Sequence, residues 1–426
     1  MKFKVGSKKA LVFIVLFGLI LGVMVGGLLI NLKKAAADKN YMDVQKQKLD
    51  VENRINSGDV SLVSNNEIHN ENDDEKFDNN EKSTIKENED LLVVPTMLDE
   101  IKNDSVYCPT FQIVWNELSD YFCDGKKVEM LNGTNSLIEN LNERTFEKTD
   151  LSDDYYYVKV GKSVLSVKKE IEDGIKDKFN ETSDILDMVA WGDDSGEDFN
   201  IDAYEKYVFY SMLKREFSFN EPFDVINENG IFKDFTNVKY FGINSDSDSK
   251  LRDQVDVLFY EDYNNHSVLL NTKQGDEVIL LRVSDNSFKN FDEVYKYLEI
   301  KTNEFEGERE FVKDDDLTVP NIKFDVLKKY NELIGKTFNS NEGVTREISD
   351  ALQTIRFEID NEGGKIKSEA IIAVKMSAII LPREKRNFSY DDTFYLMLRE
   401  NGKNKPYFMV RVDNIELFQE TAEKMN

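Results

Sequence analysis

The sequence predicts a folded domain of mixed β-strands and α-helices behind an N-terminal apolar segment. Ile355, Phe357 and Ile359 alternate with charged residues, which is the period of a strand with one buried face. Another set of apolar side chains recurs at helical spacing: Phe111, Val114, Trp115, Leu118 and Phe122. The run from Ala10 to Ile30 is apolar throughout and long enough, as a helix, to cross a bilayer.

We expect four segments along the chain: a cytoplasmic tail at 1–9, a transmembrane helix at 10–32, an acidic disordered stalk at 33–90 and the folded domain at 91–426. The stalk is rich in Asp, Glu, Asn and Lys, so it buries too little apolar surface to fold. A cleavable signal peptide ending near 35–37 is the alternative for the apolar run. Lysines flank the run on both sides, but a large domain translocates largely regardless of charge, so we expect an extracytoplasmic domain on a single-pass anchor.

Composition excludes several classes of function. The chain has 426 residues, with 82 acidic against 55 basic side chains and a formal charge of −27. This charge argues against nucleic acid or an anionic membrane face as a partner. Only two histidines are present, His69 and His266, so neither a His-dependent catalytic triad nor a His-rich metal site is expected. With no nucleotide-binding or nucleophile motif found, we expect no enzyme activity and no cofactor.

The two cysteines, Cys108 and Cys123, cannot form a disulfide framework. If one helix spans the segment between them, they lie about 22 Å apart, far beyond the ~6 Å of a disulfide. We expect free thiols. Cys108 and Pro109 are predicted as the N-cap and the first residue of that helix.

Further elements follow from the same periodicities. Strands are predicted at Tyr155 to Val167, Val255 to Tyr260, Ser267 to Leu270 and Glu277 to Val283. Apolar residues mark the buried faces of two further helices: Ile171, Ile175 and Phe179 in one, and Phe291, Val294, Tyr295 and Leu298 in the other.

The stretch after Ile359 predicts a hinge followed by a long segment with strand character. Asn361-Glu362-Gly363-Gly364 contains consecutive glycines, which permit backbone angles that strand residues avoid. The residues from Lys365 to Leu381 include no glycine, proline or turn cluster. Taken by twos they form one small or apolar face and one more polar face, so the segment could enter a sheet. An ordinary edge strand has the same alternation and is the alternative on pattern alone.

Four blocks of sequence resemble the serpin family, in the family's order and spacing. The blocks are Val319–Phe324 with Leu333-Ile334-Gly335 and Phe338, Ile355–Gly363, Phe388–Phe394 with Leu396 and Leu398, and Phe408–Asn414. Tyr207–Leu213 is similar, more loosely, to a strand of the family's central sheet, with Ser211 in place of an Asn and Phe219 in place of a Trp. At the start of the first helix, Cys108 and Phe111 stand in place of serines.

The resemblance implies an α+β fold with a large central sheet, two smaller sheets and about eight helices, including a short helix at Leu333–Gly335. It also implies a protease inhibitor that works as a suicide substrate. A protease cleaves an exposed reactive-centre loop, the loop inserts into the central sheet as a new strand, and the attached protease is deformed. Hydrogen bonds and burial gained by the inserted strand supply the free energy.

Residue by residue, the resemblance places the hinge at Glu362, Gly363, Gly364, Lys365 and Ile366. Counting fourteen residues on from Gly363 places the reactive bond among Met376, Ser377 and Ala378. Small or apolar side chains there suggest a serine protease of elastase-, chymotrypsin- or subtilisin-like preference, and Lys375 leaves a trypsin-like target as a minority option. Inhibitory serpins have small residues after the hinge, whereas 366–369 is Ile-Lys-Ser-Glu here. A non-inhibitory serpin-like interaction or surface module is therefore the alternative.

Overall fold

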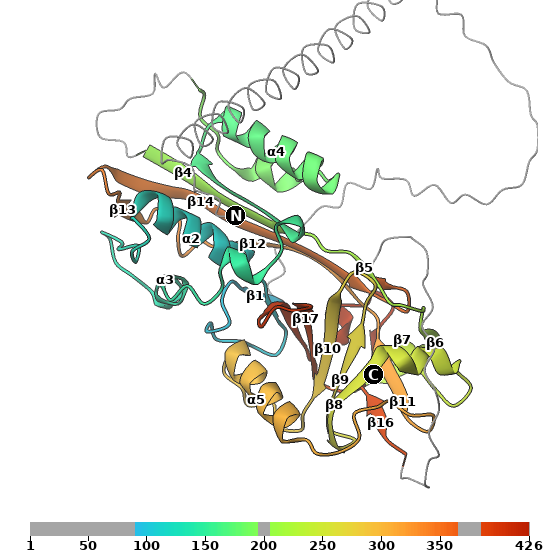
Figure 1. Cartoon of the computed structure of the whole chain (residues 1–426). Coiled ribbons are helices and arrows are strands. Elements are labelled where there is room, and N and C mark those ends of the chain that lie inside the picture. The colour runs from blue at the N-terminus through green and yellow to red at the C-terminus, as the bar shows by residue number, and fades with distance from the viewer. Residues whose placement is uncertain (1–89, 195–204, 365–384, 426) are drawn as a thin grey trace, which may run out of the picture. The chain divides into compact units, whose positions relative to one another are not determined.

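The computed structural model describes residues 90–194, 205–364 and 385–425, all within one unit of the fold, Lys82–Asn426 (Figure 1). The predicted transmembrane helix and nearly all of the predicted stalk lie outside these residues. So do Lys365, Ile366 and the predicted reactive bond at 376–378. Within the described ranges, no helix is long and apolar enough to span a membrane.

A seven-stranded sheet contributes buried side chains to two of the apolar clusters. Its strands, in spatial order, are β1 (Leu92–Val94), β2 (Ser105–Tyr107), β18 (Pro406–Val412), β17 (Phe394–Glu400), β10 (Asp276–Arg282), β9 (Asn265–Asn271) and β8 (Val255–Asp262). β18 is buried at every residue, as expected for a strand covered on both faces. Helix α5 (Phe291–Glu304) buries the four side chains predicted from its spacing in a cluster with Tyr395 and Met397. The predicted strand, strand, strand, helix order is therefore confirmed.

A second sheet has five strands, which alternate along the chain with those of the first sheet. It contains β16 (Asn387–Ser389), β11 (Asp316–Pro320), β7 (Phe235–Ile243), β19 (Glu423–Lys424) and β6 (Asp224–Phe232). β16 runs parallel to β11, and β11 runs antiparallel to β7. β6 pairs with β7 through three register shifts, which bend this edge of the sheet.

The third sheet contains the strand predicted at Ile355–Ile359. Its strands are β12 (Ile322–Lys329), β14 (Thr345–Ile359), β4 (Glu205–Leu213) and β3 (Tyr156–Lys162), with β13 (Thr337–Asn339) beside the start of β14. We call it the hinge sheet, because its longest strand runs into the predicted hinge. It has five strands, so the largest sheet of the described fold is the seven-stranded one and not the sheet that the resemblance makes central.

Both faces of the hinge sheet are covered by helices (Figure 1). On β4, Tyr207 and Phe209 pack into the cluster of α2 (Thr110–Phe122), whereas Val208 and Tyr210 pack into the cluster of α4 (Leu165–Phe179). Successive side chains of a strand point to opposite faces, so a strand buried on both faces needs an unbroken apolar run. The sequence from 207 to 213 supplies it at every position except Ser211.

The described residues contain four α-helices, which makes the expectation of about eight wrong for this part of the chain. They are α2, α3 (Ser136–Asn142), α4 and α5. Five short 3-10 helices accompany them: Lys148–Asp150, Asp153–Tyr155, Asp184–Met188, Ser249–Gln254 and Ile415–Leu417. A two-stranded ribbon of β5 (Phe217–Ser218) and β15 (Gly363–Gly364) completes the fold.

Three local predictions need correction. The expected short helix at Leu333–Gly335 is a turn, because the backbone N–H of Gly335 donates to Ile348 O (2.8 Å) on β14 and Gly335 has a positive φ of 75°. The strand predicted from Tyr155 to Val167 ends at Lys162, because Val167 folds back over Gly161, where a Cβ would come within 2.7 Å of its side chain.

The start of α2 is displaced by one residue. Pro109 takes the N-cap position and Thr110 is the first helical residue, whereas Cys108 and Pro109 were predicted for these positions. In the described part of the chain, Cys108 and Cys123 are free thiols at the two ends of this helix.

Candidate functional site

The candidate site is the boundary between β14 and β4, which we call the seam. The two strands pair directly and in parallel, from Arg346 opposite Glu205 to Ile355 opposite Leu213, with one register shift after Ile348. On the sides away from the seam, β12 pairs antiparallel with β14, and β3 pairs antiparallel with β4. β14 and β4 thus run in the same direction toward the same end of the sheet, where the predicted hinge begins.

The chain reverses direction as soon as β14 ends. The backbone groups of Asp360 and Gly363 exchange two hydrogen bonds, at 3.1 and 3.2 Å. β15 (Gly363–Gly364) then pairs antiparallel with β5 (Phe217–Ser218), which comes shortly after β4 in the chain. Glu362 contributes its carbonyl, which accepts from Phe219 N at 3.0 Å. The glycines therefore already run opposite to β14 and to the strand that follows β4.

The two glycines of the hinge, Gly363 and Gly364, leave little room for a side chain. Gly363 has a φ of 123°, and a Cβ there would lie 2.5 Å from the carbonyl oxygen of Phe217 and 2.5 Å from Ser218 Cα. At Gly364 a Cβ would lie 3.0 Å from Glu358 O on β14 and 3.1 Å from the Phe217 ring on β5. Gly364 therefore lies between the continuation of β4 and the end of β14, at the mouth of the seam.

A buried polar cluster crosses the middle of the seam. Gln353 on β14 is the register partner of Ser211 on β4, and both contact the start of α2. The Gln353 amide donates to Thr110 Oγ1 (2.8 Å) and to the Cys108 carbonyl (3.1 Å), and it accepts from the Tyr330 hydroxyl (2.5 Å). Thr110 Oγ1 in turn donates to Ser211 Oγ at 3.3 Å.

This cluster is uncharged as well as buried. Burial raises the pKa of the Cys108 thiol to about 11 and raises the pKa of Tyr330 far above its usual range. Both groups are therefore protonated at neutral pH and act as neutral hydrogen-bonding groups. Sequence analysis singled out Ser211 as a departure from serpins and Cys108 as a helix N-cap, a free thiol and a departure from serpins, and it missed Gln353, Thr110 and Tyr330. The available signal was one amide in the apolar sequence 351–355.

The other end of the 365–384 segment is anchored by ion pairs. Arg386 is 5% exposed and its guanidinium contacts the Asp315 carboxylate, which is 1% exposed, at 2.6 Å. Arg386 also donates to the carbonyls of Glu308 (2.6 Å) and Glu310 (2.7 Å). The neighbouring Lys385 pairs with Asp316 at the start of β11. Such a doubly buried pair is costly to break, so the downstream base is fixed while the upstream base is a glycine hinge.

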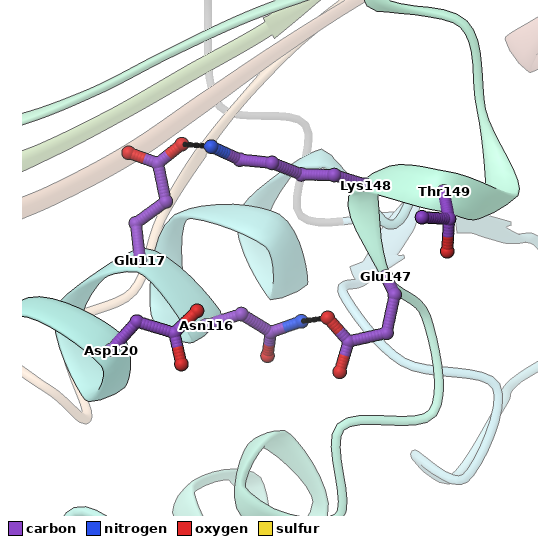
Figure 2. A pocket seen from close by; sticks show the side chains of 6 residues that line it. All are labelled: Asn116, Glu117, Asp120, Glu147, Lys148 and Thr149. Atoms are coloured by element: carbon purple, nitrogen blue, oxygen red, sulfur yellow. Dashed lines mark hydrogen bonds and ion pairs between the residues drawn. The ribbon is translucent and has the colours of Figure 1, made fainter. Parts of the chain in front are cut away.

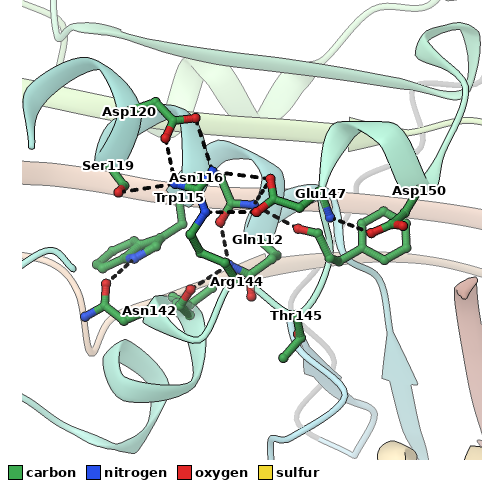
Figure 3. Close-up of polar contacts among 12 residues, drawn as sticks. Gln112, Trp115, Asn116, Ser119, Asp120, Asn142, Arg144, Thr145, Glu147 and Asp150 are labelled. Atoms are coloured by element: carbon green, nitrogen blue, oxygen red, sulfur yellow. Dashed lines mark hydrogen bonds and ion pairs between the residues drawn. The ribbon is translucent and has the colours of Figure 1, made fainter. Parts of the chain in front are cut away.

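A polar pocket of about 350 Å³ lies on the surface of α2 and is lined by Asn116, Glu117, Asp120, Glu147, Lys148 and Thr149 (Figure 2). Its carboxylates already have partners. Glu117 pairs with Lys148 at 2.5 Å (Figure 2). Arg144 contacts Asp120 at 2.6 Å and Glu147 at 2.9 Å (Figure 3). These contacts fasten the 144–150 segment to α2. No cluster of His, Cys, Asp and Glu suited to a metal ion occurs among the residues that the structure describes.

Comparison with known proteins returns similarity at the level of structure. No protein-family model matches the chain, and no curated protein matches it. A highly specific serpin of the insect Tenebrio molitor is 10% identical, with a TM-score of 0.42 over 73% of this chain and 92% of that one. Human thyroxine-binding globulin is 12% identical, with a TM-score of 0.44 over 73% and 92% of the two chains.

A third similar structure is the thermophilic serpin tengpin in its native state, with 13% identity, a TM-score of 0.43 and coverage of 74% of this chain and 89% of that one. Serpins are also the family that the four sequence blocks resemble. The chain is similar in structure to serpins. In this chain, Phe388–Phe394 includes most of β16, Phe408–Asn414 includes most of β18, and Ile355–Gly363 covers the end of β14 and the reversal.

Proposed function

We propose that the chain is a membrane-tethered, extracytoplasmic serpin-like inhibitor that acts on a serine protease by cleavage and insertion of its own loop. The observation that carries this proposal is the position of Gly363–Gly364 at the mouth of the seam, where the chain has already reversed. The proposed hinge comprises 362–366 and the proposed reactive bond lies among Met376, Ser377 and Ala378. The protein is proposed to have no catalytic activity of its own.

The direction of the strands favours insertion at the seam. β14 and β4 are parallel, so a strand continuing from Gly364 between them would be antiparallel to both. One parallel boundary would be replaced by two antiparallel ones, which are slightly more stable per residue. The sequence from Lys365 to Ser377 is long enough to run beside the whole seam, from Ile355 and Leu213 to Arg346 and Glu205.

The inserted strand supplies free energy through new backbone hydrogen bonds. One additional ladder of around ten backbone hydrogen bonds contributes about 1 kcal/mol per bond. Opening the seam disrupts the Gln353 cluster, whose connection to β4 passes through the 3.3 Å contact between Thr110 and Ser211. A long neutral hydrogen bond of this kind contributes at most about 1 kcal/mol. The anchored Arg386 prevents the downstream base from following the hinge, so we expect insertion to require cleavage.

The experiment is a thermal melt before and after limited proteolysis, with the cleavage point read by mass spectrometry. A cut between Lys375 and Ile379 is expected to raise the melting temperature by tens of degrees, because a few kcal/mol already moves a domain by several degrees. An unchanged melting temperature after such a cut would refute the inhibitor proposal. A second readout, a stoichiometric covalent complex between the chain and the protease, distinguishes a true inhibitor from a substrate.

A non-inhibitory serpin-like surface module is the second candidate. It is favoured by Ile366, a bulky residue where inhibitory serpins have small ones, and by Lys367 and Glu369 in the same stretch. Slow insertion lets the protease complete hydrolysis and leave. This candidate predicts a cleaved loop, free active protease and no stable complex.

A further inference from the structure

One carboxylate, that of Glu181, forms ion pairs with side chains at both strands of the seam. Glu181 follows α4, whose C-cap Asn180 has the left-handed conformation (φ 53°) that turns the chain toward the sheet. One oxygen of Glu181 contacts Lys214 Nζ at 2.9 Å, and the other contacts Arg356 Nη1 at 3.0 Å. Lys214 directly follows β4, and Arg356 lies on β14 just after the last register pair, Ile355 with Leu213.

The position of these contacts is at the end of the seam nearest the hinge. Lys214 also donates to the carbonyl of Phe179, the last residue of α4, at 3.3 Å. The same helix packs Ile171 and Ile175 against side chains of both strands, including Tyr210 on β4 and Leu352 on β14. Glu181 therefore extends the cover that α4 forms over the seam to the point where an inserting strand would enter.

We propose that Glu181 is a positioning residue that holds the seam closed and sets the rate at which the cleaved loop inserts. This inference rests on the proposed function. Separating β14 from β4 by one strand width moves Lys214 and Arg356 apart by about 5 Å, and one carboxylate cannot contact both at that separation. At least one of the two ion pairs of Glu181 must break before a strand can enter. The inserted form does not depend on either ion pair for its stability.

The two cations keep other partners when Glu181 is removed. Lys214 also pairs with Glu216 at 3.1 Å, and Arg356 also pairs with Asp325 on β12 at 2.7 Å. Asp325 lies on the far side of β14 from the seam, and Glu216 lies on the same chain segment as Lys214. Loss of Glu181 therefore breaks the connection between the two strands without leaving a buried charge unpaired, so the melting temperature of the uncleaved chain is expected to fall by only a few degrees.

The rate of insertion is the property that distinguishes this role from ordinary stabilisation. The side chains of Glu181, Lys214 and Arg356 are 24%, 24% and 30% exposed, so each ion pair is partly screened. Each such pair contributes a factor of about two to five to an equilibrium or rate. Glu181→Gln is therefore expected to accelerate insertion about 5- to 20-fold, and Lys214→Gln, which removes one connection, to have an intermediate effect.

The matched control is Glu170→Gln. Glu170 also joins α4 to the hinge sheet, through Lys159 on β3 at 2.5 Å, but this pair does not cross the seam. The full chain is cleaved with excess protease, and insertion is followed by tryptophan fluorescence. The chain's two tryptophans, Trp115 and Trp191, pack in the clusters on opposite faces of the hinge sheet. Melts of the uncleaved variants are recorded in parallel.

The inference predicts faster insertion for Glu181→Gln, an unchanged rate for Glu170→Gln and similar uncleaved melting temperatures for both. Raising the salt from about 0.1 M to about 1 M should accelerate the wild type and leave Glu181→Gln nearly unaffected, because salt screens the pairs. Equal rates for Glu181→Gln and wild type, with the melting shift on cleavage intact, would overturn the role of Glu181 alone. Loss of that melting shift in the wild type would overturn the proposed function itself.

Discussion

Replacing Gly363 by alanine tests whether the hinge is docked at the mouth of the seam. The substitution adds one methyl group where a Cβ would lie 2.5 Å from two backbone atoms of β5, the oxygen of Phe217 and the Cα of Ser218. Backbone atoms of a paired strand cannot turn away as a flexible side chain can. Gly363→Ala must therefore either strain the hinge or push β15 off β5.

The expected cost has two parts. A non-glycine residue at a φ of 123° costs about 1–3 kcal/mol in backbone strain. Overpacking against a fixed neighbour adds about 1–3 kcal/mol. We expect Gly363→Ala to lower the free energy of unfolding of the uncleaved chain by about 2–6 kcal/mol in total.

Gly343→Ala is the control, because Gly343 also has a positive φ (76°) but has no atom within 4 Å of its Cβ position. Gly343→Ala is therefore expected to lower the free energy of unfolding only by the backbone strain of alanine at a positive φ, about 1–2 kcal/mol. The assay is equilibrium unfolding in denaturant, with the midpoint and slope compared among the three proteins. Equal losses for the two variants would refute the docked hinge, since the difference between them measures the contact with β5.

Three further predictions concern the target, pH and topology. Ser377→Arg should redirect inhibition toward trypsin-like proteases, whose specificity pocket needs a cation, and unchanged selectivity across a protease panel would place the reactive bond elsewhere. Burial lowers the pKa of His266 to about 4, below its unfolded value near 6.5. The contribution of neutral His266 to the free energy of unfolding is therefore fully present above pH 6.5 and is lost as the pH falls toward 4. Unfolding at pH 7 and pH 5 should show this loss in the wild type and less of it in His266→Phe. Protease added to intact cells should release the folded domain by cutting between Lys39 and Asp90, and release only after lysis would reverse the proposed orientation.

The elements that sequence analysis predicted correctly are those whose periodicity is local and strong. The alternation at Ile355, Phe357 and Ile359 lies on β14, with all three side chains buried. The four apolar residues of α5 are likewise buried as predicted. In both cases buried apolar side chains recur at the period of the element within a short stretch of sequence, so the local pattern alone determines whether the stretch is a strand or a helix.

The features that sequence analysis missed depend on contacts between distant residues. Glu181, Lys214 and Arg356 come from three separate elements, and nothing in their local sequence indicates that one carboxylate holds both cations. Gln353 contacts Thr110 across more than 240 positions of the chain. The turn at Leu333–Gly335 was predicted as a helix because the resemblance implied one, whereas pairing of Gly335 with Ile348 on β14 determines its conformation.

The central claim is that a cleaved loop enters between β14 and β4, and a distance across the hinge sheet measures this directly. Lys159 on β3 and Lys329 on β12 lie at the same level, because both are in register with the paired residues Tyr210 and Leu352. Spin labels are attached to cysteines at these two positions in a Cys123→Ser background, where the remaining Cys108 is buried. After a cut between Lys375 and Ile379, the mean label separation is expected to increase by one strand width, about 5 Å. An unchanged separation in the cleaved protein would contradict the account.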